Sequence, residues 1–369
     1  MNSKWEYRKI GDVCIVERGG SPRPIDQYIT NDANGINWIK IGDTSESMYI
    51  TETAQKIKPE GMKKSRYVQP GDFLLSNSMS FGRPYILKTD GCIHDGWLVL
   101  RDKNSFFDKR FLYYYLSAKP TYEKFKMIAV GGVVNNLNSE MVRKISVPVP
   151  CKAEQIEIAN LLDIVNRIIL KRKQTLQKLD ELVKARFVEM FGDCKSMVSM
   201  NELCSIITDG THQPPRFQES GIPFIFVSNL VGNVVTYNAE KFISEDTYAE
   251  LYKRTPIEIG DLLLSTVGSY GHPAVVTEDR KFLFQRHIAY LKPRHNMVNS
   301  FYLHSALLAP DGQRQIEEKV KGIAQKTLNL SEIKKIVVPL PTIEEQNQFE
   351  KFINQVDKSK LLQFFCFPI

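Results

Sequence analysis

Two short loops combine glycine, proline, hydroxyl and cationic residues in a mixture that suits a polyanionic ligand. They cover residues 18–24 and 209–216. Their glycines allow close approach, their prolines stiffen the backbone, and their polar side chains donate hydrogen bonds that can reach phosphates and base edges. Either loop alone is more simply explained as a surface loop without a ligand. Their recurrence at equivalent early positions of two diverged segments favours a functional role.

Motifs that would indicate catalysis are missing from the sequence. There is no phosphate-binding loop of the type G-x-x-x-x-G-K-[ST], no G-x-G-x-x-G fingerprint and no H-E-x-x-H pair, and the six histidines do not cluster. The Asn/Asp-Pro-Pro-aromatic tetrapeptide of amino-methyltransferases is also missing, because residues 213–216 lack both its first residue and its aromatic. We therefore expect a non-catalytic chain that binds no metal and no cofactor of its own.

Length and composition limit the class of protein. A chain of 369 residues suggests two or three domains, and 43% hydrophobic with 25% charged residues is ordinary for a globular protein. The 49 Lys and Arg exceed the 42 Asp and Glu, a mild excess that fits a polyanion binder without requiring one. No apolar stretch is long enough to span a bilayer, and the six cysteines form no C-x-x-C pair. We expect a cytoplasmic protein with reduced cysteines.

The clearest organising feature is an internal repeat with an offset near 190 residues. Residues 71–76 (GDFLLS) recur as 260–265 (GDLLLS), and SFGRP at 80–84 recurs as SYGHP at 269–273. Six of eleven positions are identical between residues 145–155 and 336–346. An offset of this size indicates two copies of a whole domain.

Local patterns within each copy predict an α+β fold. Gly71-Asp72 and Gly260-Asp261 are typical of a tight turn into a buried strand. The Val-Pro-Val-Pro and Val-Pro-Leu-Pro segments predict an extended exit toward a helix. Residues 110–118 and 300–308 are helical candidates, and short runs rich in Val, Ile, Phe and Leu predict strands at 38–41, 73–75, 97–100, 224–227, 262–264 and 288–291.

A long helix is predicted from Glu154 to about Phe191, where neither Pro nor Gly occurs. Apolar residues recur at spacings of three and four, which favours a coiled-coil seam with a partner helix over a helix packed only on its own domain. The predicted seam consists of Ile158, Leu162, Val165, Ile169, Leu176, Leu179, Val183 and Met190, matched after the second copy by Phe349, Ile353 and Val356. The pattern then stops at Lys360 and Gln363, so we expect a shortened distal helix.

This plan resembles the DNA specificity (S) subunit of type I restriction-modification systems. The resemblance rests on the paired Gly-Asp-x-Leu-Leu-Ser runs, the Pro-x-Pro-x-x-x-Glu-Gln helix starts and the Leu-Asn pairs 137–138 and 328–329. It implies two target recognition domains, at 1–150 and 194–341, with spacer helices at 151–193 and, apparently truncated, 342–369. It further implies that the helices pair antiparallel and set the two halves of a split DNA sequence about one helical turn apart.

The resemblance also implies partners. They are double-stranded DNA, two methyltransferase subunits that use S-adenosylmethionine, and restriction or translocase subunits that use ATP and Mg²⁺. Self-association through the spacer helix would complete a half-paired spacer.

Candidate DNA contacts come from three loops of each copy. They are the early loops, the residues after the recurrent strand and the loops before the exit helices: Ser21, Arg23, Asn77, Ser80, Arg83, Asn135, Asn136, Thr211, His212, Arg216, Ser269, Tyr270, His272, Gln325 and Lys326. Features common to both copies suit structure or phosphate binding. The differing pairs Asn77/Thr266 and Arg83/His272 are better candidates for base discrimination.

Two other functions stay open from sequence. The chain could be an inactive specificity fragment that acts as a coiled-coil interaction module, which the interrupted heptad at Lys360 favours. It could also be a self-contained DNA methyltransferase or nuclease with an unrecognised site.

Overall fold

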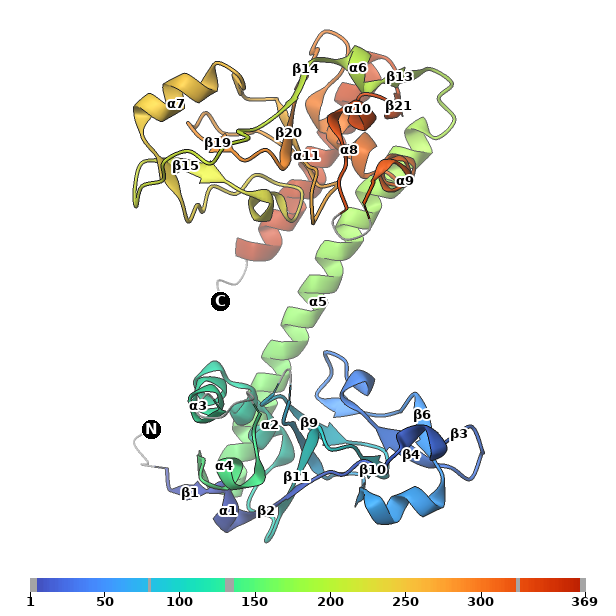
Figure 1. Ribbon diagram of the computed structural model, residues 1–369, viewed down its shortest axis with the longest axis vertical. Helices are drawn as coiled ribbons and strands as arrows, with labels where there is room; N and C mark the ends of the chain where they lie inside the picture. The colour runs from blue at the N-terminus through green and yellow to red at the C-terminus, as the bar shows by residue number, and fades with distance from the viewer. Residues whose placement is uncertain (1–4, 79–80, 130–135, 323–325, 366–369) are drawn as a thin grey trace. The chain divides into compact units, whose positions relative to one another are not determined.

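The computed structural model describes residues 5–78, 81–129, 136–322 and 326–365. The chain divides into two compact units, residues 1–170 and residues 171–369. Each unit has mixed strands and helices, and the elements follow one another in closely similar order in both units (Figure 1). This confirms the predicted α+β fold with a repeated domain.

Unit 1 is built on two five-stranded sheets, with strand orders β2-β11-β8-β9-β5 and β3-β6-β4-β10-β7. A separate ladder joins β1 to β12. The strands are β1 (Tyr7–Lys9), β2 (Cys14–Arg18), β3 (Ile29–Thr30), β4 (Ile36–Ile39), β5 (Tyr49–Ile50), β6 (Gln55–Ile57), β7 (Arg66–Val68), β8 (Phe73–Ser76), β9 (Pro84–Leu87), β10 (Gly91–Ile93), β11 (Trp97–Asp102) and β12 (Ser146–Pro148).

The helices of unit 1 pack against the first of these sheets and share its apolar core. They are α1 (Ile10–Val13), α2 (Lys109–Ser117), α3 (Lys119–Ala129), α4 (Ser139–Arg143) and the first part of α5 (Lys152–Phe191). Short 3-10 helices, η1 (Ile25–Gln27), η2 (Ile41–Asp43) and η3 (Pro59–Lys64), connect the strands.

Unit 2 repeats this arrangement with sheets β14-β20-β17-β18 and β16-β15-β19 and a ladder of β13 with β21. Its strands are β13 (Met197–Ser199), β14 (Cys204–Asp209), β15 (Ile222–Ile225), β16 (Phe242–Ile243), β17 (Leu262–Ser265), β18 (Pro273–Val275), β19 (Leu283–Phe284), β20 (Ile288–Pro293) and β21 (Val337–Pro339). Its helices are the second part of α5, α6 (Met200–Leu203), η4 (Val227–Leu230), α7 (Glu245–Tyr252), α8 (Ser300–Leu308), α9 (Pro310–Lys319), α10 (Leu330–Ile333) and α11 (Ile343–Phe365).

The repeated Gly-Asp pairs form the predicted turns. Gly71 and Gly260 have φ of +93° and +92°, a region that favours glycine. Asp72 accepts a hydrogen bond from the Gln69 backbone N–H at 3.0 Å, and Asp261 accepts one from the Glu258 N–H at 2.8 Å. Both turns lead into fully buried strands, β8 and β17.

Two of the predicted strands end earlier than their apolar runs. Ile41 and Val227 extend the apolar runs 38–41 and 224–227, but each begins a 3-10 helix. Asp43 and Asn229 accept hydrogen bonds from the backbone N–H groups of Lys40 and Phe226, which turns the chain at those points. Local side-chain bonding therefore overrides strand propensity there.

A buried glutamine joins each long helix to its own unit. The Gln155 Nε2 donates to the carbonyls of Phe106 and Pro150, and its Oε1 accepts from the Asp108 N–H. Gln346, 191 positions later, bonds the carbonyls of Met297 and Pro341 and the Asn299 N–H in the same way. Both glutamines are fully buried, so the Glu-Gln motif after the prolines is a structural clamp.

Within unit 2, α11 runs antiparallel to the second part of α5. Phe349, near the start of α11, packs against Phe187 and Phe191 with ring centroids 5.5 Å apart in both pairs. Further along α11, the Lys360 ammonium lies 2.9 Å from Asp180. The two helices thus meet over the part of α5 that belongs to this unit.

The predicted seam residues differ in their exposure. Phe349, Ile353 and Val356 are buried, and Val183 and Met190 pack against the unit 2 core. Ile158 packs against the unit 1 core, whereas Val165 is 41% exposed; Leu162, Ile169, Leu176 and Leu179 are half-buried. The heptad pattern missed the aromatic pair Phe187 and Phe191, which carries the contact with α11.

Replacing Gln155 by Leu should destabilise unit 1 by about 3 kcal/mol, because three backbone groups lose a buried partner. All three tryptophans, Trp5, Trp38 and Trp97, lie in unit 1, so urea unfolding followed by tryptophan fluorescence reports on this unit. The matched control is Glu157→Leu, at an exposed position of the part of α5 that lies in unit 1. Equal midpoints for the two variants would contradict the clamp.

Candidate nucleic-acid interface

Three strand ends meet at one edge of the main sheet in each unit. In unit 1, β2 ends at Arg18, β8 ends at Ser76 and β11 begins at Trp97, and β11 is antiparallel to both neighbours. In unit 2, β14, β17 and β20 meet in the same way. We call this place the strand-end edge; it comprises residues 18–23, 76–78, 81–83, 94–97 and 136–138 in unit 1, and 209–212, 265–272, 285–288 and 326–329 in unit 2.

Backbone hydrogen bonds bring the predicted loops together at this edge. The Asn77 N–H donates to the Gly96 carbonyl at 2.9 Å, and the Asn77 carbonyl accepts from the Leu137 N–H at 2.9 Å. The Gly19 N–H donates to the Trp97 carbonyl at 2.9 Å. The early loop, the loop after β8 and the loop before α4 therefore share one frame.

Unit 2 has the same frame at equivalent positions. The Thr266 N–H donates to the His287 carbonyl at 2.9 Å, the Leu328 N–H donates to the Thr266 carbonyl at 2.8 Å, and the Gly210 N–H donates to the Ile288 carbonyl at 3.2 Å. The frame thus uses backbone atoms in both units, which leaves the side chains around it free to differ.

The glycines of the early loops are required by this packing. A Cβ on Gly19 would lie 2.2 Å from the His94 carbonyl oxygen, and one on Gly210 would lie 2.2 Å from the Phe284 carbonyl oxygen. Neither position has room for a side chain. The recurrence of these glycines is therefore explained by close backbone approach.

The shared serines at the ends of the recurrent strands are also structural. The Ser76 Oγ accepts from the Arg83 N–H at 2.9 Å, and the Ser265 Oγ accepts from the His272 N–H at 2.9 Å. These bonds close a hairpin whose outer residue differs between the units, Arg83 in one and His272 in the other.

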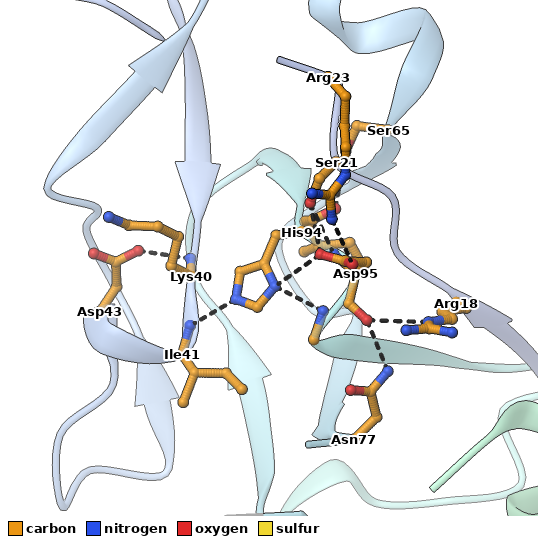
Figure 2. Close-up of polar contacts among 12 residues, drawn as sticks. Arg18, Ser21, Arg23, Lys40, Ile41, Asp43, Ser65, Asn77, His94 and Asp95 are labelled. Atoms are coloured by element: carbon orange, nitrogen blue, oxygen red, sulfur yellow. Dashed lines mark hydrogen bonds and ion pairs between the residues drawn. The ribbon is translucent and has the colours of Figure 1, made fainter. Parts of the chain in front are cut away.

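In unit 1, Asp95 organises the early loop (Figure 2). Its carboxylate accepts from the Ser21 hydroxyl at 2.7 Å and lies 3.5 Å from the Arg23 guanidinium. Its backbone carbonyl accepts from the Arg18 Nε and the Asn77 Nδ2 at 3.1 and 2.8 Å. The hydrogen bond from Ser21 lowers the pKa of Asp95, so the carboxylate stays charged and holds the exposed Arg23 side chain over the edge.

His94 links this edge to the second sheet of unit 1. The Ile41 N–H lies 3.1 Å from its Nε2, and the Gly96 N–H lies 2.7 Å from its Nδ1 (Figure 2). A neutral imidazole accepts at one ring nitrogen, whereas a protonated ring accepts at neither. Burial lowers the pKa of His94 despite the nearby Asp95 and Asp43 carboxylates, and Lys40 lowers it further. The ring is therefore neutral near pH 7.

Unit 2 holds its candidate residues with different carboxylates. Asp209 lies 2.8 Å from the His212 Nε2 and 2.7 Å from the Arg254 Nη2. Glu317 accepts from the Tyr270 hydroxyl and lies 2.9 Å from the Lys326 ammonium, and these two hydrogen bonds lower its pKa. Three of the predicted contact residues are thus held by acidic neighbours that sequence reasoning did not select.

The predicted contact residues are not equally accessible. Arg23, Arg83, His212, Arg216, Ser269 and Lys326 are exposed, and Ser21, Asn136, Thr211, Tyr270 and His272 are half-buried. Asn77 and Thr266 are 2% and 5% exposed. The Asn77 Nδ2 donates to the Asp95 carbonyl, and base discrimination by the pair Asn77/Thr266 stays a prediction. Ser80, Asn135 and Gln325 lie outside the described residues.

Other classes of site are not found in the described parts of the chain. There, no group of three or more His, Cys, Asp or Glu side chains is arranged to hold a metal ion. Among the same residues, none of the helices is both long enough and apolar enough to cross a bilayer. Five cysteines are free, and the sixth, Cys366, is outside the described residues.

Comparison with known proteins places this architecture in a class. Residues 2–181 and 196–363 match the family described as the type I restriction modification DNA specificity domain. Since this match covers most of both units, the chain belongs to that family. Its members supply DNA specificity rather than catalysis, so the chain is a specificity subunit and not an enzyme in its own right. The alternative of a self-contained methyltransferase or nuclease is thereby overturned.

Individual relatives agree with this assignment. The chain is 25% identical over 360 residues to the type I restriction enzyme EcoBI specificity subunit of Escherichia coli, covering 88% of this chain and 74% of that protein. It is 24% identical over 395 residues to the MjaIX specificity subunit of Methanocaldococcus jannaschii, covering 97% and 90%.

Solved structures are similar in fold. An S subunit from M. genitalium has a TM-score of 0.53 at 14% identity, covering 98% of this chain and 91% of that one. A chain from a structural study of complex assembly and conformational transition of the type I R-M system has a TM-score of 0.56 at 17% identity, covering 97% and 92%.

The neutral state of His94 should make unit 1 less stable in acid. Its pKa in the folded protein lies below the ordinary value of about 6.5, so stability is lost as pH falls through about 6.5 toward the folded pKa. We expect the stability advantage of the wild type over His94→Gln, about 1 kcal/mol at pH 7.5 from one net hydrogen bond, to shrink by pH 5.5. Urea unfolding followed by tryptophan fluorescence measures this, and an advantage that does not change with pH would refute it.

Proposed function

We propose that this chain recognises a bipartite DNA target, with one half bound at the strand-end edge of each unit. In this proposal, residues 1–150 and 194–341 are the two target recognition domains. The observation that carries it is the repeated backbone frame: both units present three loops on equivalent hydrogen bonds, yet the exposed side chains differ. A common frame with different side chains suits two half-sites of different sequence.

The exposed cations at the two edges support binding to a duplex. Arg23 and Arg83 lie at the edge of unit 1, and Lys326 lies at that of unit 2, with Arg216 in the adjoining loop. The exposed His212 adds a hydrogen-bonding imidazole at the edge of unit 2. Guanidinium and ammonium groups bind phosphates and base edges, and they give affinities that fall with salt. Their carboxylate partners hold several of these groups in place before DNA arrives.

The proposal includes partner proteins and a location. The chain would direct two methyltransferase subunits, which use S-adenosylmethionine, and restriction or translocase subunits, which use ATP and Mg²⁺. It would itself hold no cofactor and act on double-stranded DNA in the cytoplasm.

The complex should select one split DNA sequence. When the full chain is combined with its methyltransferase subunits and a random DNA pool at moderate salt, the recovered sequences should share two short conserved blocks separated by a constant gap. Arg23→Ala and Lys326→Ala should each weaken binding several-fold and reduce its salt dependence. A pool without any enriched sequence would contradict the proposal, and a single uninterrupted block would contradict its bipartite part.

A second candidate function, a helical interaction module, is favoured by an apolar stripe on α5. Leu161, Ile164, Val165 and Ile168 occupy one face of the helix and are 41–61% exposed. Acidic residues precede the stripe, Glu154 and Glu157, and basic residues follow it, Lys171 and Lys173. If two copies of this helix paired antiparallel, they would bury the stripe, and the acidic end of one stripe would lie beside the basic end of the other. The partner that fits the stripe is therefore a second copy of this chain.

Self-association through the stripe should depend on its apolar residues. Sedimentation of the full chain should show a dimer that Ile164→Asp dissociates, because a carboxylate would be buried at the centre of the interface. Leu170→Asp is the matched control, since Leu170 is exposed on the opposite face of the helix. A dimer that persists in Ile164→Asp would show that the stripe is not the dimer contact. A monomeric wild type whose methyltransferase binding is lost in Ile164→Asp would show that the stripe binds that subunit instead.

A further inference from the structure

At two positions of the strand-end edge, the side chains of the two units have opposite charges. The last residue of β2 is Arg18, whereas the last residue of β14 is Asp209. The residue two places before β11 is Asp95, whereas the residue two places before β20 is Arg286. Both pairs are 191 positions apart, and the backbone frame around them is the same. Equivalent points of the two edges therefore carry opposite charges.

In unit 1 both groups are used within the protein. The Arg18 Nε donates to the Asp95 carbonyl, and the Asp95 carboxylate holds Ser21 and Arg23. Asp209 of unit 2 is occupied in a similar way, by His212 and Arg254. The Asp95 and Asp209 carboxylates therefore build the edge, whereas Arg18 takes part through its Nε.

Arg286 differs from the two carboxylates and, like Arg18, is bound within the described chain through its Nε. Its side chain is exposed, and its Nε lies 3.3 Å from the His287 Nε2. Within the part of unit 2 that the structure describes, its two Nη atoms have no hydrogen-bond or ion-pair partner. Burial and the Arg286 charge lower the pKa of His287, so the neutral ring can accept from the Nε and orient the guanidinium.

The surroundings of Arg286 form a small polar recess. The cavity measures about 270 Å³, and its lining includes Thr266, Arg286, His287 and Asn329. Asp209 also lines it, but its carboxylate is already paired with Arg254 and contacts His212. The recess adjoins the loop that carries Lys326, a candidate DNA contact.

We propose that Arg286 is a specificity-determining residue that binds a guanine in the half-site recognised by unit 2. A guanidinium with two free Nη groups matches the O6 and N7 acceptors of guanine in the major groove. If Arg286 bound a phosphate, which is present whatever the base, a cation would be expected at the equivalent position of unit 1 as well. A residue that contacts a base is expected to differ between two half-sites of different sequence. The equivalent residue of unit 1 is Asp95, so the two units do differ at this position. This inference rests on the proposed DNA recognition.

The test compares bound sequences for the wild type and three variants of the full chain, each combined with the methyltransferase subunits and the same random DNA pool. Arg286→Lys keeps the charge but loses the paired donors. Arg286→Gln offers the amide geometry that suits adenine. Arg280→Lys is the control, an exposed arginine of the same unit that lies away from the strand-end edge. Circular dichroism verifies that each variant is folded.

We expect Arg286→Lys to reduce discrimination for guanine at one position of one half-site by about 5- to 150-fold, with the other half-site unchanged. Arg286→Gln should move the preference at that position toward adenine. An unchanged sequence in both variants, or a uniform loss of affinity with the sequence preserved, would overturn the inference while leaving bipartite recognition intact. A wild type that selects no split sequence would instead overturn the proposed function and this inference with it.

Discussion

The structure depends most on a buried amide at the start of each long helix. Gln155 and Gln346 each satisfy two carbonyls and one N–H that the loop before α2 or α8 and the proline segment would otherwise leave unpaired. Unpaired backbone groups in a core cost more than most side-chain contacts supply. A glutamine is long enough to reach all three groups and stays uncharged, so the helix leaves each unit in a defined direction.

Hydrogen bonds of the backbone also explain how the candidate interface tolerates differences in side chains between the two units. The frame at the strand-end edge uses the N–H and carbonyl of Asn77 in unit 1 and of Thr266 in unit 2, which are unlike side chains. Because the main chain carries the frame, the neighbouring side chains can change without loss of the loop arrangement. A fold used twice in one chain can thus present two chemically different surfaces.

The acidic neighbours add a second level of organisation. Asp95 holds Arg23 and Glu317 holds Lys326, while Asp209 holds His212. Such exposed ion pairs contribute little to stability, typically below about 1 kcal/mol. Their effect is to restrict the positions of long side chains before a ligand binds, which lowers the entropy that binding must remove.

The sequence by itself determined the repeat, the α+β class, the turns at Gly71 and Gly260 and the extent of α5, because each depends on local backbone preference or on apolar periodicity. It also indicated the three loops of each copy. Only the tertiary structure decided that Asn77 is buried, that Phe187 and Phe191 form the contact with α11, and that Asp95 and Arg286 occupy equivalent points. Those facts depend on which strand ends meet at an edge and on which helices pack together. Such contacts join residues far apart in the chain, so they leave no periodic pattern in the sequence.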